Sequence, residues 1–319
     1  MGQAVGHVLN PSYLALDETG TYIFAASENF DKEGAVWVFR RQLDGRLVAT
    51  GTRPSGGRAT CHVCVTARGI VCASSYIDGS LSVFRFRNGT IGPRERLFHY
   101  QGKSVNAARQ ESSHAHQAGV SHDLHWLYVC DLGADRIWCH PITDGGIAPA
   151  LPNSVATPAG SGPRHLVFHP THPRIYVICE LNAHLLTYDW STVNGLLTLV
   201  DDQPSLPNDW NGEPAAAAIR VHPSGTALYV SNRNHDSLTA FNLDTNGRAE
   251  LACCIPAGGK APRDLAVDPT GRWLLAANQK SNNLTIHPLD SKNNLPTGRT
   301  PVIAAIATPT CILFAERNV

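Results

Sequence analysis

Residues 162–180 read GPRHLVFHPTHPRIYVICE, and this stretch contains the unit from which the fold can be derived. A short apolar run, LVF at 166–168, leads into a turn rich in Pro and His, and a second apolar run, IYVIC, follows at 175–179. Two apolar runs of strand length that are separated by turn residues indicate an antiparallel hairpin. We therefore expect two neighbouring strands here, with Arg164 and Glu180 at their open ends.

The same pattern recurs along the chain. Five further copies have the same order of apolar run, polar turn and second apolar run: NPSYLALDETGTYIFAASE at 10–28, TCHVCVTARGIVCASSY at 60–76, SHAHQAGVSHDLHWLYVCD at 113–131, AAIRVHPSGTALYVSNR at 217–233 and APRDLAVDPTGRWLLAANQ at 261–279. A third apolar run follows each copy: VWVF from Val36, LSVFRF from Leu81, IWCH from Ile137, LLTY from Leu185, LTAF from Leu238 and LTIH from Leu284. A looser segment with glycine then carries a fourth short run.

Four strands per unit at a spacing of about 50 residues is typical of a β-propeller. The alternative is a β-sandwich with accidental similarity, but six copies of one pattern in register argue against it. We expect an all-β propeller that forms a single domain over 1–319. It would have six full four-stranded units, and a C-terminal strand from TPTCILFAERNV at 308–319 would start an incomplete further unit.

Strand connectivity brings polar residues of each unit together. Because the second strand runs back antiparallel to the first, the start of the first and the end of the second lie at one end of the sheet. These positions are sixteen residues apart in Arg164/Glu180 and Arg263/Gln279, and we align His116 with Asp131, His62 with Tyr76, and Arg220 with Arg233 at shorter spacings. The expected rim holds Glu28, His62, Tyr76, His114, His116, Asp131, Arg164, His165, Glu180, Arg220, Arg233, His235, Arg263 and Gln279.

The residue types of this rim indicate an anion site. Guanidinium groups match carboxylate and phosphate geometry, and histidines beside a carboxylate transfer protons near neutral pH. Several of these rim residues could instead have purely structural roles. Arg164 could pair with Glu180 and join two strands, and one of His114 and His116 could be a core histidine. Further residues have structural alternatives: Arg220 between units, Asp131 and Asp135 in a turn around Gly133, and His169, His172 and His222 at the turn position that Asp268 occupies elsewhere.

Composition narrows the classes of function. The 26 Lys and Arg balance the 26 Asp and Glu, so the chain lacks the basic excess of a nucleic-acid-binding protein. We find neither a secretory leader at the N-terminus nor an apolar run of membrane-spanning length, so we expect a cytoplasmic protein with no membrane partner. Nine scattered cysteines fit buried thiols in a reducing compartment, and the lone pair of Cys61 and Cys64 does not indicate a metal site.

The segments NPSYLAL, SHAHQ, DLGADRI, GSGPRHLVFHP, CELN, VSNRNHDSL and APRDLAVDPTGRWLLAANQKSNN resemble, in this order, the lactonase family of seven-bladed β-propellers. That family includes bacterial 6-phosphogluconolactonase and carboxy-cis,cis-muconate cyclase, and the resemblance runs from about Asn10 to Phe314. It implies a catalytic set of His116, Arg164, Glu180 and Arg233. We expect substrate contacts from Arg263, Gln279, His114, His235 and Tyr76.

The resemblance implies hydrolysis of a small anionic sugar lactone, with 6-phosphoglucono-1,5-lactone as the expected substrate and no cofactor or metal. Glu180 or His116 would act as the general base, Arg164 would stabilise the oxyanion, and Arg233 and Arg263 would hold the anionic group. The alternatives are a carboxymuconate-type cyclase, another lactone-active enzyme, and a non-catalytic binding propeller. A calcium-dependent lactonase would need more carboxylates than the rim offers. We expect a monomer or homodimer.

One departure concerns the seventh blade. Family members usually carry a longer N-terminal segment whose strands close that blade together with the C-terminal strand. Here only Met1 to Asn10 precede the first apolar run of the repeats, so we expect an incomplete seventh unit with exposed strand edges.

Overall fold

The computed structural model describes all residues except 1–4, 6–7, 152–153, 300 and 316–319. The described residues form strands, turns and loops and no helix, so none of them forms a helix that could cross a membrane. They divide into two compact units, Met1–Ser154 with Ala315–Val319, and Val155–Phe314. Our expectation of a single domain over 1–319 stays a prediction.

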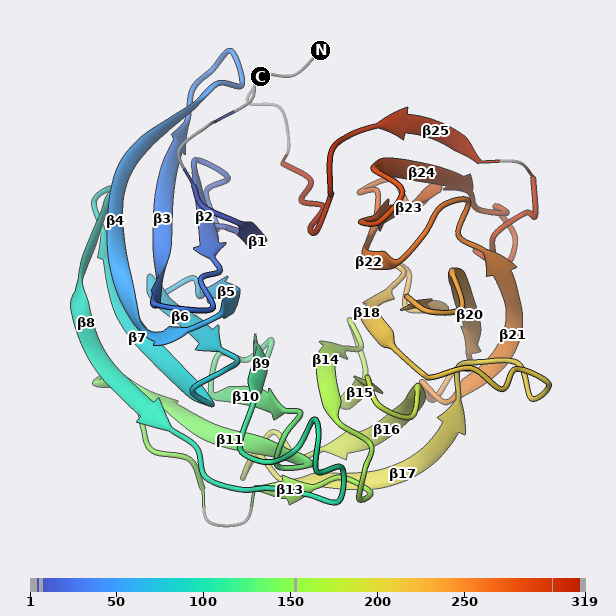
Figure 1. Cartoon of the computed structure of the whole chain (residues 1–319), viewed down its shortest axis with the longest axis horizontal. Coiled ribbons are helices and arrows are strands. Elements are labelled where there is room, and N and C mark those ends of the chain that lie inside the picture. Colours follow the sequence, from blue (N-terminus) through green and yellow to red (C-terminus); the bar gives the residue numbers. More distant parts are fainter. Residues whose placement is uncertain (1–4, 6–7, 152–153, 300, 316–319) are drawn as a thin grey trace. The chain divides into compact units, whose positions relative to one another are not determined.

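Each unit contains three antiparallel sheets (Figure 1). The strands of the first unit are β1 (Pro11–Leu16), β2 (Tyr22–Ser27), β3 (Glu33–Arg41), β4 (Leu47–Arg58), β5 (Thr60–Val65), β6 (Ile70–Ser75), β7 (Ser80–Arg87), β8 (Thr90–His99), β9 (Ala115–Val120), β10 (Trp126–Asp131), β11 (Arg136–Thr143) and β12 (Gly146–Ile147). Those of the second unit are β13 (Val155–Ala156), β14 (Pro163–Phe168), β15 (Arg174–Cys179), β16 (His184–Trp190), β17 (Leu197–Pro204), β18 (Ala216–Val221), β19 (Ala227–Asn232), β20 (Ser237–Leu243), β21 (Ala249–Pro256), β22 (Pro262–Val267), β23 (Trp273–Asn278), β24 (Asn283–Pro288) and β25 (Val302–Ala305).

Four consecutive strands pair in sequence order in each sheet, as in β14-β15-β16-β17 and β18-β19-β20-β21. The prediction of an all-β propeller with six four-stranded units is confirmed. Apolar side chains of neighbouring sheets interlock: Ile178 and Leu185 pack against Ile219 and Leu228, and all four are fully buried. Each sheet therefore buries a face against the next sheet of its unit, as blades do.

Histidine takes the place of aspartate in two hairpin turns. The Asp268 carboxylate accepts hydrogen bonds from the backbone N–H groups of Thr270, Arg272 and Trp273. In the equivalent turn after β18, His222 Nδ1 accepts the Ser224 N–H at 3.1 Å, and Nε2 reaches the Gly271 carbonyl of the neighbouring sheet at 2.9 Å. The predicted turn role of His222 is confirmed, and its ring also joins two sheets.

The first strand of every sheet contains a β-bulge near its start. The register of β14 against β15 shifts between Pro163 and His165, which leaves Arg164 as the extra residue. A bulge re-aims the side chain of its extra residue. The equivalent extra residues are Ser12, Cys61, His116, Arg263 and, in β18, the pair Ala217 and Ala218.

One backbone hydrogen bond closes each bulge. The residue after the second strand donates its N–H to a carbonyl two positions before the extra residue, at 2.7–3.0 Å. The donors are Glu28, Tyr76, Leu132, Glu180, Arg233 and Gln279. The extra residue and the closing residue therefore lie at the same end of each sheet, as expected from connectivity.

Three of the residues that we assigned to these positions from the sequence are wrong. Leu132, rather than Asp131, is the closing residue of its sheet, while Ala217 and Cys61 take the positions that we gave to Arg220 and His62. The extra residue of a bulge pairs with nothing across the strand, so alternation alone does not locate it.

The predicted C-terminal strand is absent from the described part of the C-terminal segment. Residues 306–315 form no strand, and 316–319 lie outside the described residues. Within the segment, the Ile312 N–H donates to Asp264 Oδ2 at 2.8 Å, so a side chain satisfies a backbone group that strand pairing would otherwise serve. The expected incomplete seventh unit thus contributes a loop against β22 and no strand there.

Burial lowers the pKa of His140 to about 4 from the ordinary 6.5. The folded chain holds the ring neutral: Nδ1 lies 2.8 Å from the Ala148 carbonyl and Nε2 lies 2.7 Å from the Tyr100 hydroxyl. As the pH falls from about 6.5 to about 4, His140 is protonated in the unfolded chain but stays neutral in the folded chain. The free energy of unfolding therefore decreases. We predict that His140→Gln removes up to about 3 kcal/mol of this decrease, measured by urea unfolding at both pH values.

The matched control for this prediction is His99→Gln, because His99 is exposed. It should keep the pH dependence of the wild-type chain. An unchanged dependence in His140→Gln would contradict the buried neutral ring.

Candidate active site

Three charged residues meet at one end of the second unit's sheets. Arg164 is the extra residue of the β14 bulge, Glu180 closes that bulge, and Arg233 closes the equivalent bulge of the next sheet. Because β14 and β18 lie side by side, the same ends of the two sheets are neighbours. The fold therefore delivers two guanidinium groups to one carboxylate.

Both arginines bind the same oxygen atom. Arg164 Nε lies 2.9 Å from Glu180 Oε2, and Arg233 Nη2 lies 2.8 Å from that atom. The Arg164 and Glu180 side chains are only 2% and 6% exposed, while that of Arg233 is 18% exposed. Two guanidinium charges and one carboxylate charge leave the cluster with a net charge of +1, so its accessible side, at Arg233, favours an anion.

Other contacts fix the two guanidinium groups. Arg164 Nη1 donates to the Ala217 carbonyl at 2.6 Å and to His165 Nε2 at 3.2 Å. Arg233 Nε donates to the Ala215 carbonyl at 3.2 Å. A charged group held by several partners keeps its orientation before a ligand arrives, which favours binding. The expected pairing of Arg164 with Glu180 is therefore present, and it extends to Arg233.

The remaining predicted residues of the second unit lie at the same ends of its sheets. Arg263 is the extra residue of the β22 bulge and Gln279 closes it, which makes them the equivalents of Arg164 and Glu180 in the neighbouring sheet. His235 lies in the turn after β19, with Nδ1 2.7 Å from the Ser237 hydroxyl. Arg263, Gln279 and His235 are each partly exposed.

Sequence analysis missed Trp210. Its indole packs edge-on against the His235 ring at 5.3 Å between centroids, and it lies in the loop that joins β17 to β18. The Asn234 amide donates to the Glu213 carbonyl and so joins the same loop to the turn that carries His235. A Trp between Pro and Gly residues in a loop was the only available signal, and the repeat pattern did not include it.

The first unit brings together Tyr76, His114 and His116. The Tyr76 and His114 rings stack at 4.4 Å, and the His116 ring meets Tyr76 edge-on at 6.1 Å. His114 Nδ1 lies 2.9 Å from the Tyr76 carbonyl, which can only accept, so this nitrogen donates. Its Nε2 lies 3.2 Å from Glu111 Oε1. A hydrogen bond from its own backbone N–H is the main cause that holds the pKa of Glu111 below its usual range, and the contact with His114 lowers it further against the opposing effect of burial.

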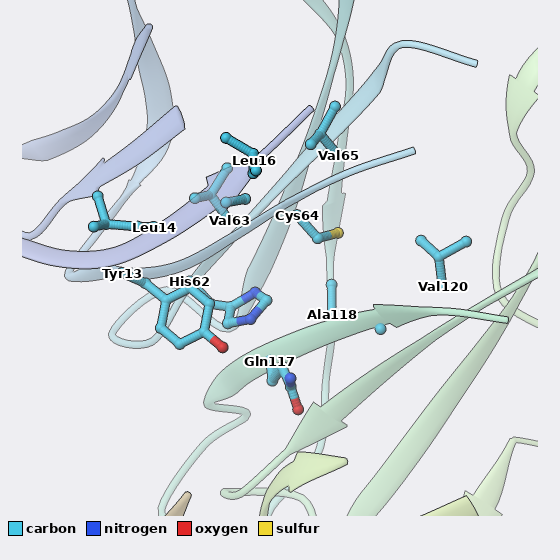
Figure 2. Close-up of a pocket in the computed structure, with 12 residues that line it drawn as sticks. Tyr13, Leu14, Leu16, His62, Val63, Cys64, Val65, Gln117, Ala118 and Val120 are labelled. Atoms are coloured by element: carbon cyan, nitrogen blue, oxygen red, sulfur yellow. The ribbon is translucent and has the colours of Figure 1, made fainter. Parts of the chain in front are cut away.

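A pocket of about 320 Å³ lies in the first unit (Figure 2). The strands β1, β5 and β9 line it, with Tyr13, His62 and Gln117 as polar side chains and with Cys64 and Val120 among the apolar ones. No charged residue lines it. The pocket therefore lacks the positive charge that we expected around an anion site, and none of our predicted catalytic residues lines it.

Two rim residues have structural roles. Arg220 pairs with Asp264 at 2.8 Å, and that carboxyl is 1% exposed. Asp131 accepts the N–H groups of His114 and Ala134 and the indole N–H of Trp138, as in the turn alternative. Among the described residues, no group of three His, Cys, Asp or Glu side chains could hold a metal ion.

Comparison with known proteins identifies the family. The sequence profile described as "Lactonase, 7-bladed beta-propeller" matches residues 2–314. This chain belongs to the lactonase family of β-propellers. The profile match confirms the resemblance drawn from the sequence motifs. The described residues contain six sheets, whereas the profile names seven blades.

Relatives with assigned names cover most of the chain. The chain is 28% identical to 6-phosphogluconolactonase of Bacillus subtilis, and the match covers 97% of this chain and 88% of that protein. It is 30% identical to 6-phosphogluconolactonase of Formosa agariphila, and that match covers 90% of this chain and 83% of that protein. The solved structure of a periplasmic gluconolactonase of Pseudomonas aeruginosa matches with a TM-score of 0.90 and 27% identity, over 96% of this chain and 88% of that one.

The carboxylate of Glu180 is expected to contribute strongly to the stability of the lactonase, because it pairs with two guanidinium groups. Glu180→Ala leaves two guanidinium groups facing each other where burial disfavours uncompensated charge, so we predict a loss of about 3 kcal/mol in the free energy of unfolding. Glu180→Gln keeps an oxygen acceptor and should lose less. Urea unfolding of the purified variants measures both.

The matched control is Glu33→Ala, whose carboxylate is 46% exposed and pairs with Arg94 at 3.4 Å. Exposed pairs contribute at most about 1 kcal/mol. Equal losses in Glu180→Ala and Glu33→Ala would show that the cluster is no more strongly coupled than a surface pair.

Proposed function

We propose that this lactonase hydrolyses a small anionic sugar lactone, 6-phosphoglucono-1,5-lactone, to 6-phosphogluconate. The observation that carries the proposal is the cluster of net charge +1 in which Glu180 holds two guanidinium groups while Arg233 stays 18% exposed. Relatives named 6-phosphogluconolactonase support the same substrate. A phosphorylated lactone carries the anion that such a cluster would attract.

The reaction adds water across an ester bond. A water oxygen attacks the ring carbonyl and loses a proton to a base, the carbonyl oxygen becomes an oxyanion, and the C–O bond to the ring oxygen then breaks as that oxygen takes up a proton. The products are one carboxylate and one released proton at neutral pH. The protein must therefore supply a cation near the oxyanion or the anionic substituent, and a group that transfers protons.

The exposed fractions of the two arginine side chains indicate different roles for them. Arg233 is the guanidinium that a ligand can reach, so we assign to it the contact with the substrate anion or oxyanion. Arg164 is 2% exposed and its donors bind Glu180, Ala217 and His165, so we assign to it the positioning of Glu180 and, through that carboxylate, of Arg233. Arg263 is the second candidate for the anionic substituent because it occupies the equivalent bulge of the adjacent sheet.

For proton transfer, the family resemblance implies Glu180 or His116. Oε2 of Glu180 already accepts from two guanidinium groups, which makes this oxygen a poor proton acceptor. An imidazole titrates near neutral pH, and His116 is the extra residue of its own bulge, as Arg164 is in β14. We propose His116 as the proton-transfer group. Substrate contacts of Tyr76 and His114, a cytoplasmic location, and a monomeric or homodimeric state also stay proposals.

A second candidate substrate is the unphosphorylated glucono-1,5-lactone. The solved gluconolactonase of Pseudomonas aeruginosa favours it, because that protein matches 96% of this chain. The two substrates differ by one phosphate, so they differ in what Arg233 and Arg263 would contact. An uncharged lactone would leave both guanidinium groups without an anionic partner in the ground state.

Hydrolysis of the two lactones, side by side, tests the proposal by proton release at constant pH. We predict turnover of the phosphorylated lactone well above its spontaneous rate, with a lower KM than for the unphosphorylated one. Arg233→Gln and His116→Gln should each lower kcat/KM about 100-fold, as expected for the loss of one transition-state contact or of a general acid–base group.

Arg58→Gln serves as the control because this guanidinium pairs with Asp78 on the surface and is 47% exposed. Its kcat/KM should equal that of the wild-type protein. Hydrolysis of both lactones at their spontaneous rates would contradict the proposed function, and equal KM values would contradict the role of phosphate.

A further inference from the structure

Two cysteines of the first unit face each other across a pair of strands. Cys64 of β5 and Cys72 of β6 are direct partners in the antiparallel register. Directly opposed residues project from the same face of a sheet, so the two thiols lie side by side. Among the strand pairings that the structure describes, no other two of the nine cysteines are opposed in this way.

The ladder fixes the separation of the two backbones. The Thr66 N–H donates to the Ile70 carbonyl at 2.9 Å, which makes Thr66 and Ile70 a hydrogen-bonded pair. Pairs alternate along an antiparallel ladder, so Cys64 and Cys72, two steps on, are also hydrogen-bonded partners, with Cα atoms about 5.5 Å apart. Disulfides span about 4.4–6.8 Å between Cα atoms. The Cα separation therefore lies within the range of disulfides, while the two Cβ atoms, about 4.5–5.5 Å apart in opposed pairs, must approach to about 3.5–4.5 Å for the bond to form.

The environments of the two thiols differ. Cys64 is partly exposed and is one of the residues that line the pocket of about 320 Å³ (Figure 2). Cys72 is fully buried behind it, and its pKa lies well above the usual range because it shares a hydrogen bond with the Cys64 thiol and is desolvated. A small oxidant in the pocket would therefore meet Cys64 first, with Cys72 as the resolving partner.

We propose that Cys64 and Cys72 are a redox modification site that a hydroperoxide converts into a reversible cross-strand disulfide. The Cys64 sulfur attacks one peroxide oxygen, which yields a sulfenic acid and, from hydrogen peroxide, one water. The Cys72 sulfur then attacks the sulfenic sulfur, and a second water leaves with the Cys72 proton. Two thiols lose two electrons in total, and one peroxide is reduced to two waters.

Most of the other seven cysteines lie opposite residues with no thiol, as Cys139 does opposite Tyr128 and Cys254 opposite Thr239.

The geometry also predicts that the proposed bond is reversible. A disulfide between hydrogen-bonded partners must fit a rigid ladder, and strained bonds of this kind are the labile ones. Because one thiol lines the pocket, the oxidation state sets the shape and polarity of the pocket wall beside His62.

Treatment of the purified full-length chain with hydrogen peroxide tests the site. We predict that the wild-type protein loses two of its nine titratable thiols and the mass of two hydrogens, that a peptide map without reductant links 64 to 72, and that dithiothreitol reverses the change. Cys64→Ser and Cys72→Ser should form no such bridge. Cys254→Ser, a partly exposed thiol on β21, should behave as the wild type does.

Several results would overturn the site. These are a bridge between other cysteines, retention of all nine thiols, or oxidation of Cys64 to sulfinic acid in the wild-type protein without a bridge. None of them depends on lactone hydrolysis, so this test is independent of the proposed function.

Discussion

One extra residue at the start of the first strand of each sheet is the constraint on which the candidate site depends. In a regular strand, Arg164 and His165 would project to opposite faces, and the guanidinium would have no fixed relation to Glu180. The bulge removes Arg164 from the ladder, and the bond from the Glu180 N–H to the Gly162 carbonyl closes it at 2.7 Å. The same device repeats in every sheet, so the residues at one end of a sheet are free to vary while the strands below them stay regular.

Electrostatics gives this end of the second unit its chemical character. One carboxylate oxygen accepts from both Arg164 and Arg233, which compensates part of the cost of burying charge and leaves one positive charge over. The deeper guanidinium is enclosed by protein acceptors, while the other remains within reach of a ligand. A chain with no net charge can therefore present a cationic site, because local pairing rather than total charge sets the field there.

Much of this arrangement could be predicted from residues whose role is periodic. Apolar runs and turn residues gave the strands and their order, and the turn position of Asp268 predicted the role of His222. The spacing of sixteen correctly related Arg164 to Glu180. The shorter spacing that related Arg220 to Arg233 was wrong, because Ala217, sixteen residues before Arg233, takes that position while Arg220 pairs with Asp264. Only the register shows where a bulge lies, and a single sequence does not record register.

Contacts between distant segments were also outside the reach of the pattern. Trp210 lies in a loop that no repeat unit predicts, and Cys64 and Cys72 became a pair only when the β5–β6 register was known. The C-terminal segment was expected to pair as a strand, but Ile312 donates to the Asp264 side chain. In each case the deciding partner comes from elsewhere in the fold, so local propensity could not identify it.

Calorimetric titration with 6-phosphogluconate tests the anion site most directly, because it measures binding without the chemical step. The account predicts binding to the wild-type chain, equal affinity for Arg58→Gln, and at least about tenfold weaker binding for Arg233→Gln, as expected from the loss of one charge-assisted hydrogen bond. The same Kd for all three proteins would contradict the assignment of Arg233 as the ligand's cation.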